Sequence, residues 1–237
     1  QREEVVGEGI RTAERAAGQM PQDPRHGLGA RGQDQGPQAG LGSGRHPEGR
    51  GAGGHAGNQK EEQLADSVRL ALANAIHDTR PPKPVLRDAQ ARARYQAWFD
   101  EMSKRLAKRI PDQLSRTEFL ETVWYESTRA GLDPAMVLGL IQVESAYRKY
   151  AISIAGARGY MQVMPFWTKV IGDSDRRMLF NMQTNLRYGC SILRMYIDME
   201  KGNLYLALGR YNGSRGKPQY PNAVLAAWKK WEFKPAG

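Results

Sequence analysis

Residues 133–145, with the sequence DPAMVLGLIQVES, constrain the fold of this chain more than any other stretch. Asp133 precedes Pro134, and this pair predicts a helix start, because the aspartate caps free amide groups and proline suits the first helical position. The residues that follow are apolar on nearly every face, which is typical of a helix at the centre of a helical domain. The helix ends on a carboxylate, Glu144, and a charge on a buried face costs free energy unless the protein needs it there.

From residue 61 onward, apolar residues recur at intervals of three and four, the spacing of amphipathic helices. The segments with this pattern are 61–80, 87–110, 117–130, 184–201, 204–213 and 220–232. Thr117 is the expected N-cap of the third of these helices. Strand patterns are almost absent, so the sequence predicts a mainly α fold.

Composition divides the chain into three parts. Residues 1–60 contain 15 of the 26 glycines and no aromatic residue, so we predict a disordered tail that cannot bury enough apolar surface to fold. Residues 61–115 are expected to form a helical appendage that packs on the rest or docks a partner associated with the membrane or cell wall. Residues 116–235 are expected to form the main domain.

The charge and the reactive residues limit the function. With 35 Lys and Arg against 25 Asp and Glu, the net charge of +10 favours polyanionic partners. No histidine follows residue 100, and Cys190 lies in an apolar helical pattern, so His-dependent nucleophilic triads and zinc sites are excluded from the main domain. Carboxylates, amides and hydroxyls remain, and glycosidic-bond cleavage needs only these. We expect no cofactor and no metal. The chain begins without a visible export signal and has no apolar run that could span a bilayer.

Four motifs follow one another in the main domain: ES at 144–145, SIAGARGYMQVMP at 153–165, TNLRYG at 184–189 and GRYNGS at 209–214. With these motifs in this order, residues 117–231 resemble the soluble lytic transglycosylase (SLT) family of peptidoglycan-cleaving enzymes. The resemblance implies a fold like that of goose-type lysozyme. It also implies peptidoglycan glycan strands as the substrate and the periplasm or cell envelope of a bacterium as the location.

The resemblance implies a role for several residues. Glu144 would be the catalytic acid and base, with Ser153 hydrogen-bonding near it. The predicted substrate-binding residues are Ser153, Gly159, Tyr160, Met161, Gln162, Tyr211 and Asn212. The sequence departs from the usual family pattern at Tyr160, where Leu is common, and at Arg210, where Ala is common.

The residue chemistry agrees with these roles. An apolar helix end around Glu144 favours the protonated carboxyl group that a general acid needs. Gly156 and Gly159 would let the backbone approach a sugar ring, although both equally suit a tight turn. The amides of Gln162 and Asn212 suit acetamido groups. Tyr211 is an expected aromatic platform for a sugar, and Tyr160 and Tyr220 are further candidates.

A single catalytic carboxylate predicts a non-hydrolytic reaction. Glu144 would protonate the bridging oxygen and then deprotonate the muramoyl C6 hydroxyl, which would give a 1,6-anhydro ring. The alternative within the same fold is a hydrolytic muramidase, with Asp173 or Asp175 as the second carboxylate. A nucleic-acid-binding protein or a catalytically silent glycan-binding protein is less favoured. The charges are dispersed rather than striped, and Glu144 is present.

Overall fold

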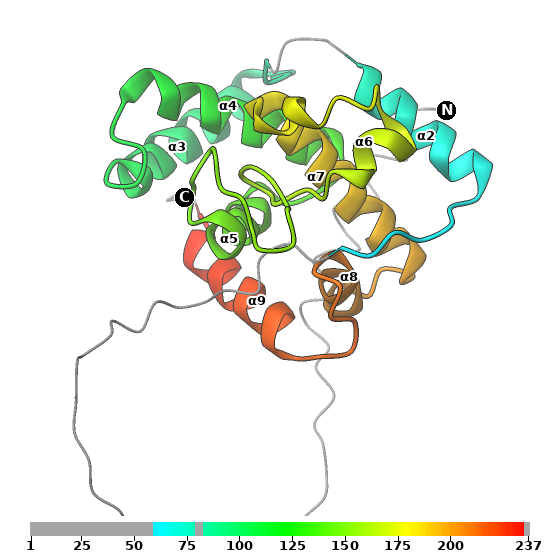
Figure 1. Cartoon of the computed structure of the whole chain (residues 1–237). Helices are drawn as coiled ribbons and strands as arrows, with labels where there is room; N and C mark the ends of the chain where they lie inside the picture. Colours follow the sequence, from blue (N-terminus) through cyan, green and yellow to red (C-terminus); the bar gives the residue numbers. More distant parts are fainter. Residues whose placement is uncertain (1–58, 79–82, 235–237) are drawn as a thin grey trace, which may run out of the picture.

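The computed structural model describes residues 59–78 and 83–234, which form a helical molecule (Figure 1). Within these residues there is no strand, only two isolated antiparallel bridges, Ile152 with Arg158 and Arg158 with Val163. The predicted mainly α fold is therefore confirmed. The tail predicted for residues 1–60 lies outside the described residues except for its last two positions. No helix in the described part is long and apolar enough to span a membrane.

The helices pack around a central apolar layer. In chain order they are α2 (Asp66–His77), α3 (Ala89–Leu106), α4 (Gln113–Arg129), α5 (Pro134–Ser145), α6 (Phe166–Ile171), the 3₁₀ helix η1 (Arg176–Phe180), α7 (Met182–Met199), α8 (Leu204–Tyr211) and α9 (Gln219–Trp231). In Figure 1, α9 lies beside α5, α7 runs through the centre, and α3 with α4 lies on the side opposite α2. The long loop between α5 and α6 covers one end of α5.

Short polar side chains fix the helix starts. Asp133 accepts a hydrogen bond from the Ala135 amide at 2.7 Å, so the cap predicted for α5 is confirmed. The N-cap predicted at Thr117 is wrong. Helix α4 begins at Gln113, and Asp112 caps it by accepting from the Ser115 amide at 2.7 Å. The first turn of α4 is polar and exposed, so the apolar periodicity does not reveal it.

Helices α5 and α9 approach each other unusually closely at Gly139. A Cβ atom at this position would lie 2.6 Å from the backbone nitrogen of Trp228. Two indole groups of α9 also donate to α5, Trp228 to Asp133 at 3.1 Å and Trp231 to Gln142 at 2.8 Å. Because Gly139 has no side chain, the backbones of α5 and α9 can touch there. The two indole hydrogen bonds fix the position of α9 along α5.

The two helices before residue 115 share the core of the domain that follows. Leu72 of α2 is buried, and the rest of the apolar stripe on that helix packs against the core. Trp98 and Met102 of α3 are buried, and Trp98 lies 4.8 Å from Trp124 of α4 between ring centroids. These helices therefore stabilise the main domain by direct packing. The division into a helical appendage (residues 61–115) and a main domain (residues 116–235) remains a prediction.

We expect Gly139→Ala to destabilise the protein and to move α9 away from α5. The added methyl group meets backbone atoms, which cannot rotate aside, and overpacking of this kind costs about 1–3 kcal/mol. Chemical denaturation of the variant measures the loss.

Gly131→Ala is the matched control, because a Cβ there has no neighbour within 4 Å and only the φ of 64° opposes it. The left-handed backbone costs an alanine about 1 kcal/mol. A Gly139→Ala variant as stable as Gly131→Ala would contradict the close approach of the two helices.

Candidate active site

Glu144 lies in the last turn of α5 and is only 3% exposed. The Tyr220 hydroxyl of α9 donates a hydrogen bond to Oε1 of Glu144 at 2.5 Å. Burial, and then the negative charge of Glu144, raises the pKa of Tyr220 well above its usual value. The phenol therefore stays protonated near neutral pH and remains a donor to the carboxyl group.

The chain reverses direction immediately after Glu144. Ala146 and Tyr147 both have positive φ angles, 50° and 64°, which L-residues rarely adopt. The Tyr147 side chain holds this reversal in place. Its hydroxyl donates to the carbonyl of Leu138 at 3.0 Å, and its ring lies 5.6 Å from that of Trp231. Backbone strain of this kind persists where the surrounding packing fixes it, and it is common at functional sites.

The side chain of Gln162 lies inside the loop that follows and binds two of its backbone carbonyls. Gln162 is 1% exposed, and its Nε2 donates to the carbonyls of Ala151 and Gly159 at 3.1 and 2.9 Å. Gly159 has a φ of 75°, and a Cβ there would lie 2.4 Å from the amide of Asn185. The GARGYMQ sequence thus forms a compact turn, and a residue larger than glycine would not fit at position 159.

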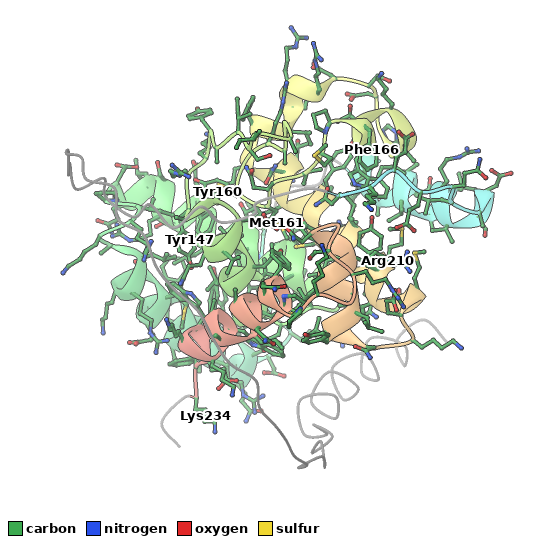
Figure 2. The ribbon with its side chains drawn as sticks, turned by 60° about the horizontal axis from the view of Figure 1, so that its bottom comes forward. Tyr147, Tyr160, Met161, Phe166, Arg210 and Lys234 are labelled. Atoms are coloured by element: carbon green, nitrogen blue, oxygen red, sulfur yellow. The ribbon has the colours of Figure 1, made fainter. Side chains whose placement is uncertain are left out.

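Met161 lies in the middle of the molecule, between Tyr160 and Arg210 in the view of Figure 2. It is fully buried, its amide donates to Oδ1 of Asn185 at 2.8 Å, and its carbonyl accepts from the Tyr211 hydroxyl at 2.8 Å. A Cβ at Gly189 would lie 2.4 Å from its sulfur. The TNLRYG motif therefore has a structural reason, because its asparagine holds the loop and its glycine makes room for Met161.

Tyr211 of α8 binds this loop through the Met161 carbonyl. Its side chain is fully buried, and its pKa is raised well above normal first by burial and then by the charge of Glu144. Its neighbour Asn212 is 4% exposed and donates to Oγ of Ser214 at 3.0 Å. The Oδ1 atom of Asn212 is buried and accepts no hydrogen bond from the described residues.

Ser153 lies at the tip of the loop and Tyr160 lies in the core. The half-buried Ser153 accepts a hydrogen bond from the amide of Ala157 at 3.1 Å, which closes the tip of the loop. The Tyr160 ring is 6% exposed and packs against Phe119 at 4.9 Å in the core. Burial raises the pKa of Tyr160 to about 12. The structure thus pairs Glu144 with Tyr220 and Tyr211 with the Met161 carbonyl, while Ser153, Gly159, Tyr160, Met161 and Gln162 build the loop.

Sequence reasoning assigned no role to Asn185 or Gln59. Asn185 lies inside a recognised motif, so the motif itself was the signal. Gln59 had no signal, because it stands at the edge of the glycine-rich segment. It is nevertheless 3% exposed, its Oε1 accepts from the Met164 amide at 3.1 Å, and its Nε2 donates to the Gln162 carbonyl at 3.4 Å.

The unusual Arg210 is explained by a second contact with the same segment. Its guanidinium pairs with Glu62 at 2.6 Å and with Glu200 at 2.7 Å. Arg215 pairs with Glu200 as well, and the two arginines lower the pKa of Glu200 to about 2. Arg210 thus ties residues 59–62 to α8, the helix that carries Tyr211.

The other acidic candidates have structural roles. Asp175 pairs with Arg177 at 3.0 Å and caps η1, and hydrogen bonds from Arg177 lower the pKa of Asp175. Oδ1 of Asp173 accepts from the Asp175 amide at 3.0 Å. Within residues 59–78 and 83–234, no group of three or more His, Cys, Asp or Glu side chains is arranged to hold a metal ion.

Comparison with known proteins finds a family whose model resembles part of this chain. Residues 121–232 match the model of the transglycosylase SLT domain. The match spans just under half of the chain. It covers Glu144, the loop and all four motifs, and its all-α, lysozyme-like fold agrees with the helices described here.

Several curated proteins are similar to the domain. The membrane-bound lytic murein transglycosylase C of Actinobacillus pleuropneumoniae serotype 5b is 35% identical over 101 residues, which cover 39% of this chain and 24% of the relative. The protein of that name from Glaesserella parasuis serovar 5 is 36% identical over 88 residues, 34% of this chain and 24% of the relative. The transglycosylase of Enterobacteria phage PRD1 is 30% identical over 115 residues, 46% of this chain and 42% of the relative.

The chain spans about a quarter of the length of the first of these relatives, so the similarity concerns the domain alone. No solved structure matches the chain.

We expect Gln59→Ala to loosen the loop that carries Met161 and Gln162. The substitution leaves the amide of the partly buried Met164 without its acceptor, and such a loss costs up to about 1–3 kcal/mol. Hydrogen exchange of the amides of residues 161–164 measures the effect, and Gln96→Ala on the exposed face of α3 is the control. Unchanged protection of these amides in Gln59→Ala would contradict the role assigned to Gln59.

Proposed function

We propose that this protein is a lytic murein transglycosylase. It cleaves the β-1,4 bond between N-acetylmuramic acid and N-acetylglucosamine without water and leaves a 1,6-anhydromuramoyl end. The observation that carries the proposal is the buried Glu144 inside an SLT domain, with the Tyr220 phenol bonded to its Oε1.

In the first step, Glu144 donates its proton to the bridging oxygen. A carboxyl group in an apolar environment favours its protonated form, which is the form a general acid needs. The apolar residues of α5 supply that environment, since Leu140 and Ile141 are fully buried just before the carboxylate. The hydrogen bond from Tyr220 fixes the orientation of the carboxyl group and stabilises the carboxylate that forms when the proton leaves.

In the second step, Glu144 takes a proton back. The acetamido oxygen of the muramoyl sugar stabilises the positive charge at C1, and its C6 hydroxyl then attacks C1 while Glu144 accepts the hydroxyl proton. Because the nucleophile belongs to the same sugar, its effective concentration is high and no second residue has to position it. The carboxyl group ends the cycle protonated, as it began.

The state of the other acidic residues supports this reaction over hydrolysis. A hydrolytic muramidase needs a second carboxylate that is free to activate water. Asp175 forms an ion pair with Arg177. Asp173 accepts a hydrogen bond from the Asp175 amide in the turn that precedes η1. Neither belongs to the loop around Glu144.

The loop and α8 are proposed to bind the sugars. The buried Oδ1 of Asn212, which has no donor among the described residues, suits the N–H of an acetamido group. Ser153, Gly159 and Gln162 present the backbone of the loop to the substrate. Tyr160 and Met161 are proposed to act through the shape of the loop, because their side chains are buried.

The proposed partner is peptidoglycan and the proposed location is the cell envelope. The net charge of +10 favours association with an acidic wall polymer. The names of the relatives refer to murein and to the membrane, which supports the same location.

Glu144→Gln is expected to abolish the release of muropeptides from purified cell wall, because an amide neither donates nor recovers the proton. Mass spectrometry of the products of the unchanged protein is expected to show muropeptides lighter by one water than hydrolysed ones. Products of full mass would indicate the muramidase instead. Residual activity of Glu144→Gln near the normal rate would exclude Glu144 as the catalytic group.

Tyr220→Phe is expected to lower kcat by about tenfold to a hundredfold, because a hydrogen bond to a charged group contributes about 1.5–3 kcal/mol. KM is expected to change little, since the phenol contacts the carboxylate rather than the sugar. Tyr125→Phe on α4 serves as the control and is expected to keep normal kcat. A Tyr220→Phe variant with normal kcat would contradict the role of this hydrogen bond.

A further inference from the structure

Residues 59–62, which we call the 59–62 segment, lie against the loop and α8 although they precede the residues that match the SLT domain. They form no helix or strand. In Figure 1, the described chain begins beside α8 and runs from there to α2. Side-chain contacts rather than secondary structure of its own therefore hold the segment in place.

Gln59 binds two backbone groups of the loop. Its Oε1 accepts from the Met164 amide at 3.1 Å, and its Nε2 donates to the Gln162 carbonyl at 3.4 Å. The backbone groups of Val163, between these two residues, bind Arg158 within the loop itself. The carbonyl of Gln162 and the amide of Met164 are thus the groups that the loop offers to a partner from outside, and Gln59 takes both.

The side-chain amide of Gln59 has the groups of an acetamido substituent. Both offer a carbonyl oxygen that accepts and an N–H that donates, on neighbouring atoms. Both sugars of the proposed substrate carry an acetamido group, and Gln162 belongs to the loop backbone that we propose to face them. The Met164 amide has a single proton, so it cannot bind Gln59 and a sugar at the same time.

The same side chain reaches α8, the second element of the proposed sugar site. Burial raises the pKa of Tyr211 well above its usual value, and a side-chain hydrogen bond with Gln59 acts in the opposite direction. Gln59 itself is 3% exposed. Its amide therefore lies between the loop and Tyr211, where a sugar held by both would have to enter.

An ion pair near the surface anchors the segment. Arg210 of α8 binds Glu62 at 2.6 Å, and the two side chains are 21% and 33% exposed. Ion pairs that water reaches add little to stability, because the solvent screens them and both side chains lose freedom. Two hydrogen bonds and one such pair make a contact that a ligand can displace.

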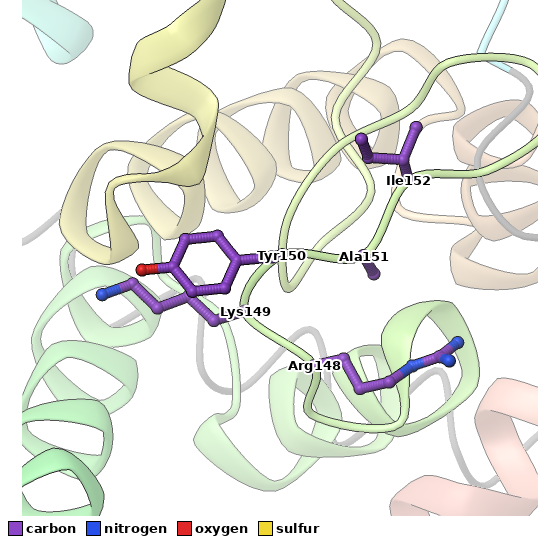
Figure 3. A pocket seen from close by; sticks show the side chains of 5 residues that line it. All are labelled: Arg148, Lys149, Tyr150, Ala151 and Ile152. Carbon is purple, nitrogen blue, oxygen red and sulfur yellow. The ribbon is translucent and has the colours of Figure 1, made fainter.

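Part of the loop stays clear of the segment. A surface pocket of about 370 Å³, lined by residues 148–152, opens at the start of the loop (Figure 3). Residues 59–62 do not line it. The segment therefore covers only the part of the loop around Gln162 and Met164, so it competes for one sugar position and not for the whole glycan strand.

We infer that the 59–62 segment is autoinhibitory: the amide of Gln59 occupies the place of an acetamido group between the loop and α8, and the glycan strand displaces it before Glu144 acts. The inference rests on the proposed function. Competition of this kind raises the substrate concentration that cleavage needs and leaves the chemical step unchanged. Because the competitor belongs to the same chain, its local concentration does not depend on the concentration of the protein.

The kinetic test measures kcat and KM of full-chain variants on solubilised peptidoglycan. In Gln59→Ala, KM falls by about threefold to tenfold, because the loss of two hydrogen bonds favours the open form. The value of kcat is unchanged, since the bound sugar takes over the Met164 amide. An unchanged or higher KM, or a lower kcat, would mean that Gln59 completes the site rather than covering it, and overturns the inference.

Glu62→Gln tests the anchor with little risk to folding, because it removes only the ion pair with Arg210 and lowers KM by about twofold. Glu101→Gln is the matched control. It breaks the ion pair with Arg105 on α3, whose side chains are 36% and 33% exposed, and it changes the net charge equally. The control keeps a normal KM. An equal fall in both variants would make net charge the cause and overturn the role of the Glu62 pair.

A binding measurement separates this inference from the proposed function. A tetramer of N-acetylglucosamine is titrated by calorimetry into the full Glu144→Gln protein, with and without Gln59→Ala, so the result does not depend on cleavage. Binding that is about threefold to tenfold tighter with Gln59→Ala supports the inference even if the enzyme proves to be a hydrolase. Equal or weaker binding, or no binding to either protein, overturns it.

Nuclear magnetic resonance follows the displacement directly. The side-chain amide signals of Gln59 are identified by their absence in Gln59→Ala. When the tetramer binds to the Glu144→Gln protein, these signals move to the positions of an exposed glutamine. Signals that stay unchanged in the complex show that the sugar and Gln59 do not compete, and overturn the inference.

Discussion

The close contact between α5 and α9 is the interaction on which the rest of the structure depends. Gly139 lets the two helices touch at backbone distance, and the indoles of Trp228 and Trp231 fix their register. That register decides whether Tyr220 reaches Glu144. The Glu144 carboxylate is therefore held by a helix that begins 75 residues later in the chain, at Gln219, and any shift of α9 changes the surroundings of Glu144 directly.

A second set of contacts holds the loop that faces Glu144. Met161 lies between α7 and α8 because Gly189 leaves space for its sulfur, while Asn185 and Tyr211 bind its backbone. The amide of Gln162 closes the same turn from inside. Several buried hydrogen bonds hold the backbone of this loop in place. Removal of either partner of such a bond lowers the stability of the protein. These residues therefore have a structural role, because they hold the backbone of the loop in one conformation.

The segment before α2 extends the site beyond the SLT domain. Gln59 and Glu62 lie outside the matched residues 121–232, yet they bind the loop and α8. Together with the packing of α2 and α3 on the core, these contacts make the preceding residues part of the folded unit. The ion pair between Arg210 of α8 and Glu62 belongs to these contacts.

The sequence by itself determined the helical class, the central helix with its Asp133 cap and the acid at its end, because periodicity and capping are local properties. It also marked Tyr211 and the GARGYMQ turn through ordered motifs. Only the tertiary structure decided that Tyr160 faces the core, that Tyr220 binds Glu144 and that Gln59 enters the loop. These contacts join residues 41 to 105 positions apart, and no local pattern encodes which buried polar groups will meet when helices pack.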